Sequence, residues 1–212
     1  MSIFTHIREI WHRKDLYRTL MNLQCRRFTL SGEVLDLGSG EAIASYHRFF
    51  GKESARIASL DGRHQHINFE KDALPYTEGS MDTVLAFNIF EHVYRYTFLL
   101  GEIRRILKEG GQVVGAVPFL VGYHADPRDY FRYTNEALEC IFEEAGFTDI
   151  RVTHIGYGPF SAGYAQVEFM MPRVLKMLLL PCALLFDRLI FFLKPNLDRK
   201  KFALGFFFSM SK

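Results

Sequence analysis

Short apolar segments alternate with helical segments along most of the chain, and this alternation constrains the fold more than any other feature. The strand candidates lie at residues 34–37, 56–60, 66–69, 82–87, 112–117, 147–155 and 203–210. Helical patterns follow the first strand as far as Phe50 and fill residues 91–108 and 136–145, with Thr134 as the expected N-cap of the last. Strands and helices at this spacing predict βαβ units and a mainly parallel sheet, so the expected fold class is α/β with seven strands.

Three parts of the chain differ in pattern. Residues 1–31 form a helical N-terminal segment in which basic side chains separate apolar ones; it either caps the domain or contacts substrate or an anionic membrane. Residues 32–155 and 203–212 carry the alternating pattern of the main domain, and residues 156–202 are an apolar insertion before the last strand. With 212 residues, 49% of them hydrophobic and 24% charged, the chain is long enough for one α/β domain.

Charge and cysteine content exclude several classes of protein. A net charge of +2 is too small to indicate a nucleic-acid partner. Cys25, Cys140 and Cys182 are too far apart for a zinc motif or a disulfide framework. The N-terminus has no continuous apolar stretch typical of a signal peptide, so a cytoplasmic location is expected.

The residues that follow the first two strands carry the strongest sign of a ligand site. Gly38 and Gly40 come directly after the first strand, and glycine lets the backbone approach a ligand closely. Asp61 ends the second strand, about 20 positions further on, where an acid can accept hydrogen bonds from ribose hydroxyls. This spacing predicts a nucleoside-containing cofactor at the carboxyl ends of the strands.

A nicotinamide dinucleotide is the alternative cofactor. Its fingerprint needs a third glycine in the turn that holds the pyrophosphate, and Ile43 stands at that position. Asp36 and Glu41 place two carboxylates beside the turn instead. Two carboxylates suit a ligand that has no phosphate and that carries a sulfonium and an ammonium group.

Four stretches together resemble class I S-adenosylmethionine-dependent methyltransferases of the type 11-like group. They are VLDLGSG at 34–40, the DALPY and SMDTV segments within 72–84, FEHV at 90–93 and RRILKEGG at 104–111. The resemblance covers about residues 33–155 and the final strand. It implies a Rossmann-like sheet with helices on both faces, S-adenosylmethionine as the cofactor, and methyl transfer as the reaction.

The resemblance also implies a set of cofactor-binding residues. They are Asp36, Gly38, Ser39, Gly40, Asp61, Asn68, Phe69 and Asn88. Asp36 would hold the ammonium group, directly or through water, and Asp61 would hold the ribose. The family often has an acid at the adenine amino group, where this chain has Asn68, with Asp72 as the competing alignment. Asn88 would line the methyl-transfer side, unless it is only a turn residue at the end of a strand.

The loop at 118–134 is the expected acceptor site because it follows the fifth strand. It resembles a methyltransferase subgroup linked to bacterial cell-surface polysaccharide synthesis, which implies O-methylation of a sugar or a lipid-linked glycan. His124 is the candidate catalytic base, since its ordinary pKa lies near neutrality. The candidate substrate-binding residues are Asp126, Asp129, Tyr130 and Arg132. Alternatively, Asp129, Arg132 and Thr134 only fix the loop and cap the next helix.

Two other readings of the function stay open at this point. A small-molecule or quinone-type methyltransferase would have a mostly apolar acceptor pocket. A non-catalytic module of the same fold would not bind the cofactor. No metal is expected: His64 and His66 form a His-x-His pair, but two ligands do not make a metal site.

The insertion contains a strongly apolar run at residues 174–193, which Pro181 is expected to divide. Its longest uncharged piece, residues 177–186, is shorter than the ~20 residues that a bilayer span needs. Three interpretations follow: packing on the sheet or on a second copy of the chain, an interfacial membrane anchor, or a substrate lid. The expected partner, through residues 172–195, is therefore a membrane surface or a homodimer.

Overall fold

A computed structural model describes residues 8–9, 14–39, 44–61 and 66–212, and it confirms the α/β class. The described strands are β1 Thr29–Leu37, β2 Gly51–Leu60, β3 Met81–Phe87, β4 Leu107–Pro118, β5 Thr148–Ile155 and β6 Gly205–Ser211. They form one six-stranded sheet in the order β2-β1-β3-β4-β6-β5. The first four strands along the chain pair in parallel, whereas β6 runs antiparallel to both of its neighbours.

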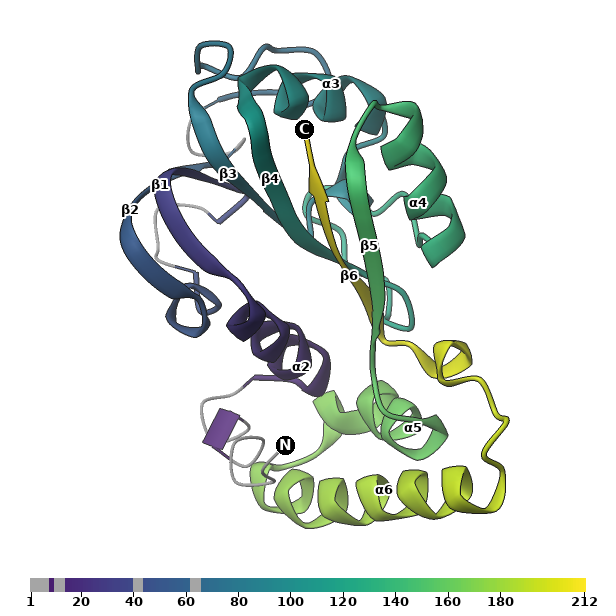
Figure 1. Cartoon of the computed structure of the whole chain (residues 1–212). Coiled ribbons are helices and arrows are strands. Elements are labelled where there is room, and N and C mark those ends of the chain that lie inside the picture. Colours follow the sequence, from purple (N-terminus) through teal and green to yellow (C-terminus); the bar gives the residue numbers. More distant parts are fainter. Residues whose placement is uncertain (1–7, 10–13, 40–43, 62–65) are drawn as a thin grey trace.

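Helices lie on both sides of this sheet (Figure 1). The described α-helices are α2 Leu16–Gln24, α3 Tyr96–Ile106, α4 Asn135–Glu144, α5 Pro159–Val167 and α6 Arg173–Leu193. Short 3₁₀ helices are η1 Cys25–Arg27, η2 His47–Phe49, η3 Phe90–His92, η4 Glu168–Met170 and η5 Arg199–Phe202. The predicted cap of α4 is confirmed, because the Ala137 amide donates to the Thr134 hydroxyl at 3.2 Å.

Two expected elements differ from the expectation in the described part of the chain. Residues 66–69, expected as the third of seven strands, form a loop. There the Asn68 amide donates to Asp72 Oδ2 and the Glu70 amide donates to Asn68 Oδ1, both at 2.9 Å. Side-chain oxygens thus accept from backbone amides that would donate to a neighbouring strand if this segment were part of the sheet. The helix expected to continue to Phe50 is only η2 within residues 44–50, and residues 40–43 lie outside the described part.

The boundaries of the next helix also differ from the expectation. The pattern over 91–108 divides into η3 and α3, and β4 begins at Leu107 rather than at Gln112. Leu107 is fully buried and pairs with Met81 of β3. Burial of such a side chain is worth about 1.5–3 kcal/mol, so packing against the sheet ends the helix early.

The last strand explains the phenylalanines near the C-terminus. Phe207 and Phe208 point to opposite faces of the sheet, because side chains alternate along a strand. Phe208 packs on Phe142 of α4 with ring centroids 4.9 Å apart, and Phe207 joins the cluster on the α2 side. Gly115 of β4 makes room for this, because a Cβ there would lie 2.4 Å from the Phe208 ring.

Residues 156–202 fold as a helical layer beyond one end of the sheet, with α6 along the edge of the molecule (Figure 1). Pro181 does not divide the apolar run, since α6 continues through it. Asp187 is buried and caps α5: its two oxygens accept from the amides of Phe160 at 2.7 Å and Ser161 at 3.0 Å. The charge that interrupts the run therefore joins two helices. Within the described residues, no helix is long and apolar enough to cross a membrane.

Candidate active site

A cavity of about 530 Å³ lies where the parallel strands end. Gly38, Asp61 and Asn88, which follow β1, β2 and β3, all line it. This is the edge at which open α/β sheets bind ligands. The other lining residues are Ile67, Asn68, Phe69, Glu70, Ile89, His92, Val93, Asp126, Pro127, Arg128 and Tyr130. The structure thus brings five predicted cofactor residues and two predicted acceptor residues to one cavity.

Gly38 holds the turn at the end of β1. Its φ of +82° lies in the left-handed region, which favours glycine. A Cβ at this position would lie 3.1 Å from Ile89 Cδ1, and the Gly38 amide donates to the Leu60 carbonyl at 2.8 Å. The backbone therefore meets the cavity without an intervening side chain, as the Gly-x-Gly pattern predicts. Gly40 lies outside the described residues.

Asp36 is placed differently from its neighbours. Its side chain is fully buried and does not line the cavity. Tyr46 donates to Oδ1 at 2.6 Å, and His47 contacts Oδ2. Burial and the adjacent carboxylate raise the pKa of Tyr46, so the phenol stays a proton donor. These contacts fix η2 against β1. Ser39 has a hydroxyl contact of 2.9 Å with Ser59 on β2.

Asn88 connects the cavity to the N-terminal segment. Its φ is +52°, a conformation that asparagine tolerates better than most residues. The Tyr17 hydroxyl on α2 donates to Asn88 Oδ1 at 2.6 Å, and burial raises the pKa of Tyr17. The sequence offered no sign of this contact, because 71 positions separate the two residues.

The acceptor loop is held by an ion pair. Arg132 binds both oxygens of Asp129, at 2.5 and 2.7 Å, and lowers the Asp129 pKa to about 2. The His124 amide donates to the same carboxylate at 2.9 Å, and Arg132 also bonds the carbonyl of Val121. Neither Asp129 nor Arg132 lines the cavity. Their contacts match the alternative in which they fix the loop.

Tyr130 presents the polar side of the loop to the cavity together with Asp126 and Arg128. The Arg128 guanidinium donates to the Tyr130 hydroxyl at 3.1 Å. A cation, a carboxyl group and a phenol thus share this wall. Such a wall suits an acceptor that carries hydroxyl or other polar groups more than an apolar ring.

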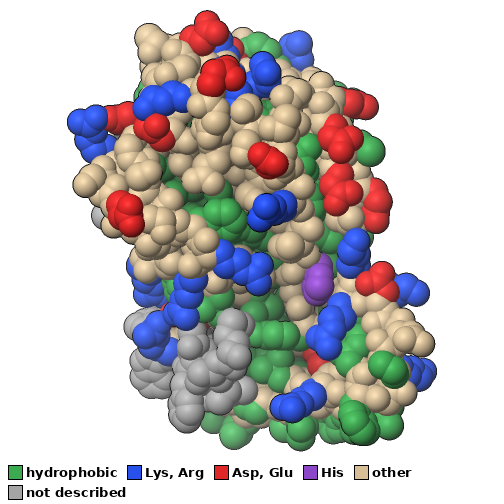
Figure 2. Space-filling view, in the orientation of Figure 1, with side chains coloured by type: hydrophobic (Ala, Val, Ile, Leu, Met, Phe, Trp, Pro, Cys, Tyr) green, Lys and Arg blue, Asp and Glu red, His purple; other side chains and the backbone are tan. Residues whose placement is uncertain are grey.

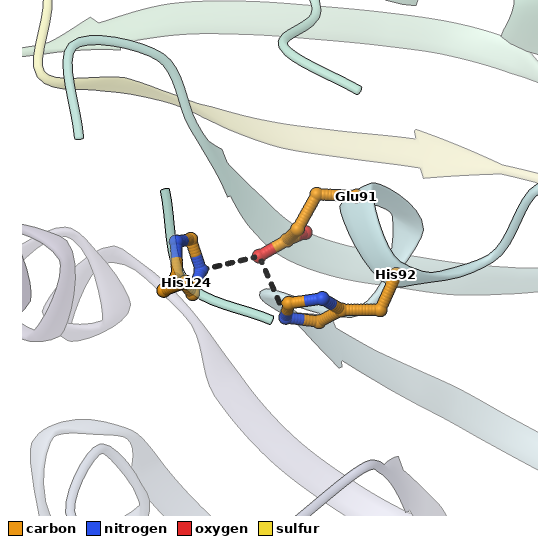
Figure 3. A group of neighbouring side chains, drawn as sticks. All are labelled: Glu91, His92 and His124. Atoms are coloured by element: carbon orange, nitrogen blue, oxygen red, sulfur yellow. Dashed lines mark ion pairs between the residues drawn. The ribbon is translucent and has the colours of Figure 1, made fainter. Parts of the chain in front are cut away.

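Glu91, His92 and His124 form a cluster beside the cavity (Figure 3). Both imidazole Nε2 atoms lie 3.7 Å from Glu91 Oε1. The Glu91 side chain is fully buried, and within the described structure neither of its oxygens has a hydrogen-bond partner. Glu91 raises the pKa of His124. The sequence pattern showed Glu91 and His92 only as part of a motif. It could not predict their contact with His124, which lies 32 positions after His92.

Comparison with known families supports the predicted class. Residues 35–115 match a family described as a methyltransferase domain. This range includes Asp36, Gly38, Asp61, Asn88 and Glu91. No curated protein matches the sequence.

Solved methyltransferase structures share the fold at low sequence identity. Phosphoethanolamine N-methyltransferase 2 of Haemonchus contortus, in complex with S-adenosyl-L-methionine, is 21% identical with a TM-score of 0.52, covering 91% of this chain and 52% of that one. The chain therefore spans about half the length of that protein. The 1,6-didemethyltoxoflavin-N1-methyltransferase of Burkholderia thailandensis, with S-adenosylhomocysteine bound, is 16% identical with a TM-score of 0.55. The alignment covers 97% of this chain and 81% of that one.

A methyltransferase of Thermotoga maritima matches over almost its whole length. It is 15% identical with a TM-score of 0.53, and the alignment covers 99% of this chain and 98% of that one. The chain thus shares the Rossmann-like fold of these methyltransferases, and its residues 35–115 match the methyltransferase domain family. Two of these structures hold S-adenosyl-L-methionine or its product S-adenosylhomocysteine.

Proposed function

We propose that this protein transfers a methyl group from S-adenosylmethionine to a hydroxyl of a small polar acceptor, a sugar or a lipid-linked glycan intermediate. One observation carries the proposal: residues expected at the cofactor and residues expected at the acceptor line the same cavity. Gly38 and Asp61 lie on its strand side, and Asp126 and Tyr130 lie on its loop side. Donor and acceptor held together in this way need little more than in-line alignment for transfer.

The reaction requires one proton to leave the acceptor. The C–O bond forms as the C–S bond of the sulfonium breaks, and S-adenosylhomocysteine leaves. We assign the hydroxyl proton to the Nε2 atom of His124. The imidazole is 39% exposed; its Nδ1 lies 3.0 Å from the Gly122 carbonyl and its Nε2 3.7 Å from Glu91 Oε1. His124 does not itself line the cavity, and its neighbour His92 does.

The polar wall of the cavity separates this proposal from its alternatives. A quinone-type acceptor would need an apolar wall where Asp126, Arg128 and Tyr130 lie. A non-catalytic module would fail to bind the cofactor. A small polar molecule other than a sugar also fits the wall, and structures of the same fold have names that refer to phosphoethanolamine and didemethyltoxoflavin.

Mass spectrometry of methylated products tests the proposal. The protein is incubated with isotope-labelled S-adenosylmethionine and a cell-envelope extract, and the labelled product is then isolated as the acceptor. With that acceptor, His124→Ala should lower turnover by about 10²–10⁴-fold and leave cofactor affinity intact. His154→Ala, on the distant strand β5, is the matched control. Unchanged turnover in His124→Ala would remove the base assignment.

We also propose that α6 rests on a membrane surface at the cytoplasmic face, where a lipid-linked acceptor would lie. Its outer side exposes large apolar residues: Val174 is 65% exposed, Leu178 64% and Phe192 80%. Basic residues accompany them, namely Arg173, Lys176, Arg188, Lys194, Arg199, Lys200 and Lys201. An apolar face flanked by cations favours the interface of an anionic bilayer.

A further inference from the structure

We propose that Glu91, His92 and His124 bind a divalent transition-metal cation at the edge of the cavity. One carboxylate oxygen and two imidazole nitrogens, all within 4.8 Å of one another, would be the ligands. His92 itself lines the cavity, so a cation held here faces the space proposed for the acceptor.

The spacing of the three atoms is close to that of a metal site. Two metal–ligand bonds of about 2.1 Å at a tetrahedral angle place ligand atoms roughly 3.4 Å apart. Both Nε2 atoms lie 3.7 Å from Glu91 Oε1, so small side-chain rotations would complete the geometry. The three residues come from η3 and from the loop after β4, and the buried Glu91 lies between the two imidazoles (Figure 3).

The hydrogen bonds of the imidazoles orient their lone pairs toward the carboxylate. His92 Nδ1 lies 2.6 Å from the Arg128 carbonyl, and His124 Nδ1 lies 3.0 Å from the Gly122 carbonyl. A carbonyl only accepts, so each of these contacts favours a hydrogen on Nδ1 and turns Nε2 toward Glu91; the Arg132 guanidinium also lies 3.4 Å from His124 Nδ1. Outer contacts of this kind are what orient metal-bound histidines in proteins.

Glu91 provides a second, independent argument. Its carboxylate is fully buried, and within the described structure neither oxygen has a hydrogen-bond partner. Its partners are the two imidazoles at 3.7 Å, which form ion pairs only when protonated; facing unprotonated nitrogens, a buried carboxylate is costly. A proton on His124 would relieve one of these contacts. A divalent cation would relieve all of them, because it accepts electron pairs from all three ligands.

The ligand set favours a particular class of ion. Two imidazoles and one carboxylate suit zinc, manganese, iron, cobalt or nickel, whereas magnesium and calcium prefer oxygen ligands. Three protein ligands leave at least one coordination position open toward the cavity. If the proposed function is correct, an acceptor hydroxyl can occupy that position and lose its proton more easily. With the ion bound, His124 Nε2 is a ligand and the hydroxyl proton leaves to water in the cavity; His124 is the base only in the metal-free protein.

Calorimetry on the chelator-treated full chain tests the site directly. We expect one Zn²⁺ per chain, bound more tightly than Mg²⁺, and Co²⁺ should give a visible absorption spectrum on binding. His92→Gln, His124→Gln and Glu91→Gln should each weaken Zn²⁺ binding at least about tenfold. His154→Gln, with its histidine on β5, should bind like the wild type.

Thermal melting separates a lost ligand from a damaged fold. Glu91→Gln removes a buried carboxylate that accepts no hydrogen bond in the described structure, so without metal it should melt at or above the wild-type temperature. Zn²⁺ should raise the melting temperature of the wild type but not of this variant. A wild type that binds no Zn²⁺, or histidine variants that bind it like the wild type, would overturn the metal site. Methyl transfer by the metal-free protein would support the proposed function whatever the outcome for the metal site. Zn²⁺ binding by a protein that does not bind S-adenosylmethionine would support the metal site and contradict the proposed function.

Discussion

Two buried carboxylates near the cavity show how differently similar residues can be used. Asp36 has both oxygens engaged, by Tyr46 and His47. Glu91 is equally buried, and no hydrogen bond reaches its oxygens within the described structure. A charge-assisted bond to a buried carboxylate is worth about 1.5–3 kcal/mol, so Asp36 stabilises the turn around it. Around Glu91, the described structure offers only the two imidazoles, each 3.7 Å from Oε1.

Asp61 gives the sharpest test of the cofactor site. It ends β2 and lines the cavity, at the position expected to accept two hydrogen bonds from ribose hydroxyls. Asp61→Ala removes both acceptors, each worth roughly 1.5–3 kcal/mol when charge-assisted. Affinity for S-adenosylmethionine, measured by calorimetry, should fall at least about tenfold.

Glu53→Ala is the matched control for this measurement, because Glu53 lies exposed on the same strand and away from the cavity. It should bind the cofactor like the wild type. Equal affinities in the wild type and in Asp61→Ala would show that the ribose lies elsewhere. Tight binding of NAD by the wild type would favour a nicotinamide dinucleotide as the cofactor.

Among the elements, α6 is unusual because it is apolar on both sides. Its buried residues are Leu180, Asp187 and Phe191, which face α5 and the domain. The exposed residues Val174, Leu178, Leu185, Leu189 and Phe192 recur at helical spacing on the other side. Figure 2 shows hydrophobic side chains along this edge of the molecule, with basic ones among them. We expect a helix of this kind to contact a second apolar environment, either a membrane surface or a second copy of the chain.

Vesicle co-sedimentation tests which environment that is. The wild type should sediment with anionic vesicles at low salt, and binding should weaken at about 1 M salt, where charges are screened. A double variant, Leu185→Glu with Phe192→Glu, should stay in solution. Its melting temperature should hardly change, because both side chains are exposed, at 65% and 80%.

Tyr123→Glu is the control for the double variant, since Tyr123 is 80% exposed on the loop after β4 and not on α6. It should bind vesicles like the wild type. A salt-resistant dimer in light scattering, lost in the double variant, would assign α6 to a second copy of the chain. A monomer that ignores vesicles would contradict both.

Sequence patterns predicted the strand ends near Leu37, Leu60 and Phe87, and with them Gly38, Asp61 and Asn88 around the cavity. Sequence patterns were sufficient there, because a buried strand and the turn that follows it depend on residues that are adjacent in the sequence. They failed for contacts between residues that are far apart in the sequence. The contact between Glu91 and His124, for example, depends on how the loop after β4 folds over η3.

Local patterns also failed where packing overrides preference. Pro181 normally interrupts a helix, since it lacks an amide hydrogen and collides with the preceding turn. Here α6 continues through it, with Leu180 on its buried side. Asp187 looked like an interruption of the apolar run, and only the fold shows that it binds the first amides of α5.

For the molecule as a whole, Glu168 joins the N-terminal segment to the helical layer. The Leu16 amide at the start of α2 donates to Glu168 Oε1 at 2.9 Å, while Oε2 is buried and without a partner in the described structure. Burial raises the Glu168 pKa from 4.5 to about 7, an effect that nearby Asp15 increases and Lys176 opposes.

This shift predicts how stability depends on pH. The folded protein keeps the Glu168 proton up to a pH of about 7, whereas the unfolded chain loses it near 4.5, so this group destabilises the fold as the pH rises through that window. The loss amounts to about 3 kcal/mol, since one pKa unit is worth 1.36 kcal/mol. Glu168→Gln keeps the acceptor for Leu16 and should melt higher than the wild type at pH 8, but not at pH 4.

Glu109→Gln, at an exposed acid, is the control and should follow the wild type at both pH values. Denaturant unfolding at each pH gives the free energies directly. If Glu168→Gln and the wild type lose stability in parallel between these pH values, the proton on Glu168 is not responsible.

The position of β6 has a consequence for synthesis on the ribosome. The first four strands can pair with one another once residues up to Pro118 have been made. Among the described strands, β5 pairs only with β6, so it has no partner until residues 205–211 follow. At about 5–20 residues per second, the nascent chain carries β5 unpaired for roughly 3–11 seconds. Its exposed charges, Asp149 and Arg151, disfavour pairing with other nascent chains during that interval.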